Sequence, residues 1–286
     1  MSRNMDQGTA FKEFEIPARP EVLAEIQRLR GLPDASLAQF AQVIAKDVGL
    51  SAAVLKTVNS PLFGLIRQIT DIHTAVALLG IHSIAQLVAS QKLRQSVTGK
   101  ACISLEKFWD TATQTAQTML LLRNHLNLHR TCPADDAYSF GLFRDCGIPI
   151  MAIKYPDYRS VLMAANQNPD RVFTEVEEEH YPTNHAVIGY YVASSWNLPQ
   201  AMTQLILRHH DPSFLDDRQV GRSQKDLYAI SKLAANILSQ VKQGSDDCEW
   251  PAVSIRVLDH LGLTEYDHDV LQADLSEELI LRHGIC

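Results

Sequence analysis

The stretch "SLAQFAQVIAKDVGLSAAVLKTVNSPLFG", residues 36–64, predicts two short amphipathic helices followed by a sharp stop. Leu37, Phe40 and Ile44 fall on one face, because steps of three and four residues match the helical period. Ser36 stands three residues before a glutamine, which is the spacing of a capping box, so the first helix should begin at Leu37. The run "AAVLKTVNS" predicts the second helix, which ends at "NSPLFG".

The same helical spacing extends in both directions from this stretch. It recurs in "PEVLAEIQRLRGL", in "DIHTAVALLG" (closed by Gly80), in "HSIAQLVASQKLRQSV" and in the long run "SLEKFWDTATQTAQTMLLLRNHLNL". The run "PADDAYSFGLFRDCGIPIMAIKY" reads as one further helix, ended by Pro156. Later helices are expected over residues 157–167, 172–180, 184–196, 200–210, 224–242, 251–261 and 267–282. No strand pattern competes with them, so we predict an all-α fold.

A polar break, "RQSVTGKAC", divides this series of helices near residues 97–104. We therefore expect four parts, taken in chain order. They are an N-terminal tail (1–14), an N-terminal helical bundle (15–100), a second helical half (101–245) and a C-terminal helical extension (246–286).

The composition indicates an ordered protein with a substantial core, since 46% of its 286 residues are hydrophobic and 21% are charged. The formal net charge of −7 argues against a broad nucleic-acid-binding face. The start, "MSRNMDQGTAFKEF", lacks the apolar run of a signal peptide, and no window is long enough to span a bilayer. Five scattered cysteines without a C-x-x-C pair argue against disulfides and structural zinc. We expect a cytoplasmic protein with no membrane contact.

Four residues are candidates for a metal or catalytic site: Asp145, His185 and the adjacent pair His209 and His210. Each falls within a predicted helix, and the gaps between them place them on different helices. Imidazoles and carboxylates from converging helices can hold a metal ion. On spacing alone, roles in helix packing and capping are the simpler reading of these residues.

Three other features have a simple reading and a sharper one. The acidic run from Glu175 to Glu179 is most simply a solvated helix face, and otherwise a docking face for a basic partner. The thiol of Cys146 is most simply buried and inert rather than reactive. In "NSPLFG", Asn59 and Ser60 are expected to cap helix ends and Gly64 to meet a backbone demand, although the loop could also bind a ligand.

Several segments together resemble the HDOD family, the HD-related output domains of bacterial signalling. They are "IPARPEVLAEIQRL", "DASLAQFAQVIAKDVGLSAAVLKTVNSPLFGL", "ITDIHTAVALLGI", the pair Phe108-Trp109 and "HAVIGYYVASSWNLPQAMTQLILRHHDP". The most specific piece is Asn59-Ser60 followed by Gly64. The resemblance covers roughly residues 15–240, and it implies an N-terminal bundle packed on an HD-domain-like half.

The resemblance also implies a degenerate metal site. HD phosphohydrolases take metal from a first histidine, a His-Asp pair and a distal aspartate, and some add accessory histidines. Carried over, the first histidine falls at Thr111, the pair at Arg144 and Asp145, the distal aspartate near Ser231, and the accessory histidines at His185, His209 and His210. Thr111 and Ser231 are poor ligands, and a guanidinium repels a cation.

We therefore expect Arg144 to supply the positive charge that the metal once supplied, hydrogen-bonded to a carboxylate of the chain. In the alternative, Arg144 points to solvent, and Asp145, expected mid-helix and partly buried, is held by the histidines.

The leading functional hypothesis is a non-catalytic signalling module that binds a protein partner or a small ligand, with no cofactor, metal or nucleic acid. The alternative is a metal-dependent phosphohydrolase with an altered site, whose ligands would be Asp145, His185, His209 and His210.

Overall fold

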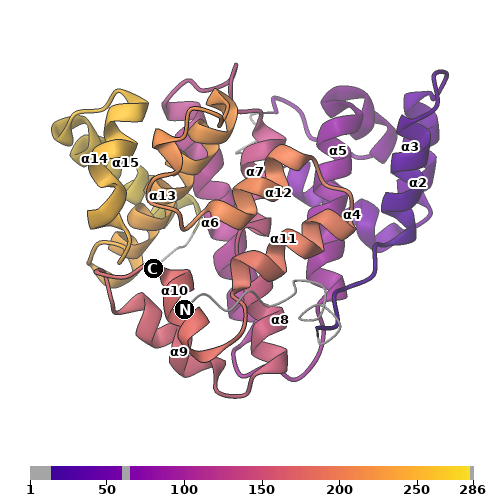
Figure 1. Ribbon diagram of the computed structural model, residues 1–286. Coiled ribbons are helices and arrows are strands. Elements are labelled where there is room, and N and C mark those ends of the chain that lie inside the picture. The colour runs from indigo at the N-terminus through magenta and orange to yellow at the C-terminus, as the bar shows by residue number, and fades with distance from the viewer. Residues whose placement is uncertain (1–13, 60–64, 284–286) are drawn as a thin grey trace.

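The computed structural model describes residues 14–59 and 65–283. Throughout these ranges the chain forms helices joined by turns and loops, without a strand, which confirms the predicted all-α fold (Figure 1). In the described ranges no single helix has both the length and the apolar character to cross a membrane. One bent pair, Ile72–Ile81 with Ser83–Ser96, meets those criteria jointly by length and composition.

Within residues 14–59 and 65–96, the N-terminal bundle contains four helices: α2 (Glu21–Arg30), α3 (Leu37–Ala45), α4 (Val48–Val58) and α5 (Ile72–Ser96). The predicted capping box is confirmed, because the Ser36 hydroxyl accepts from the Gln39 backbone and the Gln39 side chain accepts from the Ser36 backbone. Phe40 and Ile44 are buried, as their spacing predicted, whereas Leu37, expected on the same face, is 42% exposed.

Two residues break or end helices of the bundle at the positions that the sequence indicated. Gly80 interrupts α5 with φ 79° and ψ 170°, a conformation that glycine adopts without strain. Asn59 ends α4, and its side chain donates to the carbonyl of Ile69 and accepts from its amide, which joins the end of α4 to the segment just before α5. The roles predicted for Ser60 and Gly64 lie outside the described residues.

The second half surrounds a central pair of helices that approach closely. Its elements are α6 (Leu105–His125), α7 (Ala134–Phe143), α8 (Gly147–Lys154), α9 (Tyr158–Asn166), α10 (Phe173–His180), α11 (His185–Ser195), α12 (Gln200–Arg208), the 3-10 helix η3 (Phe214–Asp216) and α13 (Arg222–Gln243). A Cβ at Gly141 of α7 would lie 2.5 Å from the Cα of Ala116 in α6, so only glycine permits this contact.

One sequence prediction fails in this half, because residues 133–155 form two helices rather than one. Residues 144–146 are a turn between α7 and α8. The cause is Pro149, which lacks an amide hydrogen and whose ring would clash with the carbonyl four residues earlier, at Asp145. In the first turn of α8 a proline is tolerated. Asp145 therefore lies at a helix break and not in mid-helix.

The remaining elements hold the parts together. The indole of Trp196 donates to the carbonyl of Pro17 at 2.8 Å, and Gln27 of α2 donates to the carbonyl of Trp196 at 2.7 Å.

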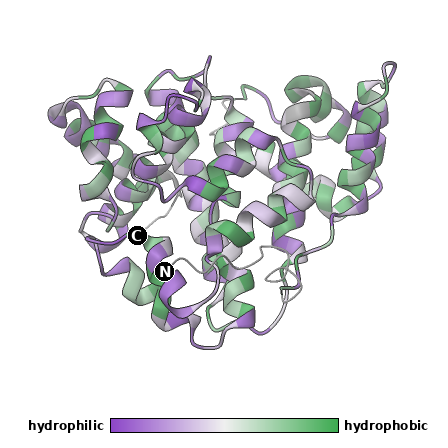
Figure 2. Cartoon of the chain, viewed as in Figure 1, coloured by the Kyte–Doolittle hydropathy of each residue, from purple (hydrophilic) through white to green (hydrophobic). Residues whose placement is uncertain are grey.

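The last helices, α14 (Trp250–Leu261) and α15 (Glu265–His283), pack on α13 at the end of the molecule opposite the N-terminal bundle (Figure 1). Hydrophobic and hydrophilic segments alternate along the helices (Figure 2), as expected of helices with one buried face.

Candidate functional site

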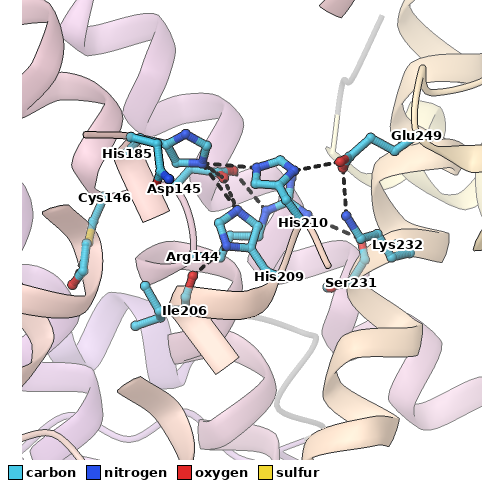
Figure 3. A network of polar contacts seen from close by, with 12 residues as sticks. Arg144, Asp145, Cys146, His185, Ile206, His209, His210, Ser231, Lys232 and Glu249 are labelled. Atoms are coloured by element: carbon cyan, nitrogen blue, oxygen red, sulfur yellow. Dashed lines mark hydrogen bonds and ion pairs between the residues drawn. The ribbon is translucent and has the colours of Figure 1, made fainter. Parts of the chain in front are cut away.

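Four side chains converge at the centre of the second half: Asp145, His185, His209 and His210, which we call the Asp–His cluster (Figure 3). One donor atom from each lies within 4.8 Å of all the others. The Nε2 atom of His185 is 3.0 Å from that of His210 and 3.4 Å from that of His209. The Asp145 Oδ1 atom is 3.0 Å from His209 Nε2 and 3.7 Å from His185 Nε2.

Each imidazole is anchored from behind through its other nitrogen. The Nδ1 atoms of His185, His209 and His210 each lie 2.7 Å from an oxygen. These oxygens belong to the Glu177 carboxylate, the Ile206 carbonyl and the Glu249 carboxylate, respectively. Because each of these oxygens can accept a hydrogen bond, each Nδ1 can donate its hydrogen to it, and a neutral ring in that tautomer would offer its Nε2 lone pair to an ion in the cluster.

The cluster is built from helix ends. Asp145 lies in the turn between α7 and α8, His185 is the first residue of α11, and His209 and His210 follow the last residue of α12. The sequence correctly assigned these residues to different parts of the chain, but it wrongly placed Asp145, His209 and His210 within helices. The turn approaches α11 so closely that a Cβ at Gly147 would lie 2.0 Å from the His185 carbonyl.

Arg144 makes the expected contact with a carboxylate. Its Nε donates to Asp145 Oδ2 at 2.9 Å, and its Nη1 donates to the Ser231 carbonyl at 3.4 Å. The side chain is only 16% exposed, so the alternative in which it points to solvent is wrong. Asp145 thus faces Arg144 with one oxygen and His209 with the other. Burial opposes ionisation of Asp145, yet Arg144 and His209 hold its pKa well below the usual value.

The two remaining vestigial positions, Thr111 and Ser231, lie beside Arg144 but contribute no side-chain ligand. Ser231 is buried, and its hydroxyl donates to the Tyr228 carbonyl at 2.7 Å. Thr111 lines the cavity above the cluster. The guanidinium of Arg144 therefore bridges two of the carried-over ligand positions, at Asp145 and Ser231.

The histidines differ in their affinity for a proton. Burial lowers the pKa of His209, and it lowers that of His210 further below the ordinary value. Burial also acts on His185, but the adjacent Glu177 carboxylate outweighs it and raises the pKa of His185.

Sequence reasoning missed the residues behind the cluster. Glu177, part of the acidic run expected to be a solvated face, is fully buried, and its carboxylate accepts from His185 and from the hydroxyl of Tyr158. Phe173, Val176 and Glu177 share the buried face of α10. Helical spacing within this run would therefore have predicted that Glu177 faces the core. The buried Cys146 conforms to the simple reading, since burial raises the pKa of its thiol.

A cavity of about 520 Å³ opens onto the cluster. Its walls come from α6, α9, the turn at Arg144, the end of α12 and the segment before α14. Lys107 and Arg159 line it together with apolar side chains such as Phe108 and Leu162. The cavity is large enough for a small ligand and gives solvent a route to the Asp–His cluster.

The donor set fits a single divalent transition-metal ion. Ligands bonded to one tetrahedral ion at about 2.1 Å lie roughly 3.4 Å apart. Four pairs of donor atoms in the cluster are separated by 3.0 to 3.7 Å, and all four atoms lie within 4.8 Å of one another. Imidazoles anchored by carboxylates or carbonyls through the opposite nitrogen are typical of metal ligands. Three imidazoles and a carboxylate suit zinc, iron or manganese better than magnesium.

Comparison with known proteins establishes the class. Residues 16–212 match the family model of the HDOD domain, so the chain belongs to the HDOD family. A protein of Treponema pallidum (strain Nichols), named only as an uncharacterized protein, is 29% identical over 203 residues. The match covers 69% of this chain and 38% of that protein, so the chain spans well under half of this relative's length.

Solved structures share the fold. An HDOD domain protein from Geobacter sulfurreducens is 19% identical with a TM-score of 0.65, covering 96% of this chain and 93% of its own. A Marinobacter aquaeolei VT8 protein, provisionally named for signal transduction, is 21% identical with a TM-score of 0.67, covering 94% and 58%. A Shewanella amazonensis SB2B protein, provisionally named a metal-dependent phosphohydrolase, is 21% identical with a TM-score of 0.64, covering 90% and 88%.

Proposed function

We propose that this chain is a non-catalytic bacterial signalling module of the cytoplasm, which binds a protein partner or a small ligand and no nucleic acid. The observation that carries the proposal is the buried guanidinium of Arg144, bonded to Asp145 and to the carbonyl of Ser231. It bridges two positions that hold metal in the phosphohydrolases which the chain resembles.

The physical reason is charge. A guanidinium remains protonated under all ordinary conditions, so it excludes a divalent ion from the ligand positions that it occupies itself. Two-metal hydrolysis needs both ions about 3.5–4 Å apart to clamp the attacking and leaving oxygens. With Arg144 in the site, and with Thr111 and Ser231 in place of ligands, that clamp cannot be assembled.

The sequence led us to expect no resident metal. We propose instead that the Asp–His cluster can hold one divalent ion, because its four donor atoms lie within 4.8 Å of one another. Asp145, His185, His209 and His210 would hold it. Such an ion would supply a fixed positive charge that joins three helix ends. Arg144 keeps the second oxygen of Asp145 neutralised, and the histidine anchors keep the imidazoles oriented.

The alternative function, an altered-site phosphohydrolase, is favoured by the name given to the Shewanella amazonensis structure and by the cavity above the cluster. It would require the single ion to activate water without a neighbouring metal. The regulatory proposal explains why a permanent cation occupies the remaining ligand positions, which the hydrolase alternative does not.

Metal content and turnover test the two functions together. We expect at most one divalent ion per purified chain, measured by elemental analysis. We also expect no hydrolysis of bis(p-nitrophenyl) phosphate above background with magnesium, manganese, iron or nickel. The variant Arg144→His restores a paired ligand and should gain affinity for a second ion in calorimetry. Metal-stimulated turnover that disappears in Asp145→Ala would reverse the ranking in favour of the hydrolase.

A further inference from the structure

We propose that the C-terminal extension, residues 246–286, reports whether the Asp–His cluster holds its ion, through the side chain of Glu249. This inference rests on the single ion of the proposed function. Glu249 precedes α14 directly and lies beyond the residues matched by the family model, which ends at residue 212. It nevertheless contacts the cluster (Figure 3).

Glu249 bridges the cluster and the core helix α13. Its Oε1 atom accepts from His210 Nδ1 at 2.7 Å, and its Oε2 atom accepts from the ammonium of Lys232 at 2.6 Å. His210 is fixed on its face by Phe173, whose ring stacks on the imidazole at 4.9 Å between centroids. The Glu249 hydrogen bond and this stacking together fix the orientation of the His210 ring.

The segment that carries Glu249 has few ways to move independently of α14. The amide of Asp247 donates to the Asn236 side chain at 2.9 Å, and the Asp247 carboxylate accepts from the amide of Glu249 at 3.1 Å. The next residue, Trp250, begins α14, is buried, and stacks on His268 of α15. Contacts thus run without interruption from the cluster to both helices of the extension.

The ion and the extension should stabilise each other. A metal on Nε2 withdraws electron density from the imidazole, so its Nδ1 hydrogen becomes a stronger donor to the Glu249 carboxylate. Ion binding then strengthens the attachment of α14. By linkage, attachment of α14 raises ion affinity by the same factor, and a partner that pulls α14 away would lower it.

A purely structural role for Glu249 makes a different prediction. The carboxylate also compensates Lys232, whose side chain is only 4% exposed. If that were its whole role, replacing Glu249 would destabilise the protein equally with and without metal, and α14 would not respond to the ion. Ion-dependent protection of α14 therefore separates the two roles.

The experiment compares the wild-type chain, Glu249→Gln and the control Glu265→Gln, an exposed glutamate at the start of α15. Zinc affinity is measured by calorimetry, and hydrogen exchange of α14 is followed by mass spectrometry with and without saturating zinc. We expect zinc binding to be at least about tenfold weaker in Glu249→Gln, the lower end of the effect seen for such supporting residues.

Exchange in α14 should slow by a similar factor, about tenfold, when zinc binds to the wild type and to Glu265→Gln. In Glu249→Gln it should not change. Zinc binding to the wild type with unchanged exchange in α14 would overturn this inference alone. Equal zinc affinity in all three proteins would do the same. No zinc binding to the wild type would overturn the single-ion part of the proposed function and this inference with it.

Discussion

Replacement of Arg144 by methionine tests whether its guanidinium compensates the buried charge of Asp145. The two side chains are 16% and 23% exposed, and they meet at 2.9 Å. Removing one partner of a buried ion pair costs about 3–5 kcal/mol. His209 still contacts the other oxygen of Asp145, and both side chains are partly solvated, so we expect a loss of about 2–3 kcal/mol. For a chain of 286 residues that lowers the melting temperature by roughly 3–5 °C.

Thermal unfolding of metal-free protein measures this loss. The matched control is Arg171→Met, which breaks an ion pair with Glu179 at 2.8 Å on the exposed surface and should melt like the wild type. Saturating zinc should stabilise Arg144→Met more than the wild type, because the ion then supplies the missing positive charge. If Arg144→Met melts with the wild type in the absence of metal, the guanidinium does not compensate Asp145, and the electrostatic reasoning fails.

Three further predictions concern the residues around the cluster. In Glu177→Gln, the anchor of His185 loses its charge, and zinc affinity in calorimetry should fall by about 10- to 100-fold; unchanged affinity would exclude this anchoring role. In Gly147→Ala, the added Cβ meets the His185 carbonyl at 2.0 Å, so unfolding should become easier by about 3 kcal/mol or more; a denaturant midpoint equal to that of the wild type would contradict the close approach. Burial alone would raise the pKa of Glu249, but His210 and Lys232 hold it below its ordinary value. A depressed carboxyl pKa contributes stability that is complete above the unfolded value of about 4.3 and is lost as the pH falls through the folded value. Between pH 7 and pH 3, melting temperature should therefore fall less steeply in Glu249→Gln than in the wild type.

Local signals predicted the helices well, because each depends on a few adjacent residues. The capping box at Ser36 and the break at Gly80 both appear where the sequence indicated. The missed break at residues 144–146 was also within reach of local rules, since Pro149 forbids a continuous helix through Asp145. The apolar spacing continues across Pro149, so spacing alone joined the two helices into one.

Sequence reasoning of the same kind identified only part of the candidate site. Residue type and the family resemblance identified the four members of the Asp–His cluster and the unusual Arg144. Glu249, which anchors His210, could not be identified in this way. The two residues are 39 positions apart in the chain, and only folding brings them together. No local pattern distinguishes Glu249 from the solvated acids nearby. Which residues orient the ligands depends on how the helices pack. The proposed link between the Asp–His cluster and the C-terminal extension is therefore visible only in the packed arrangement of α13 and α14.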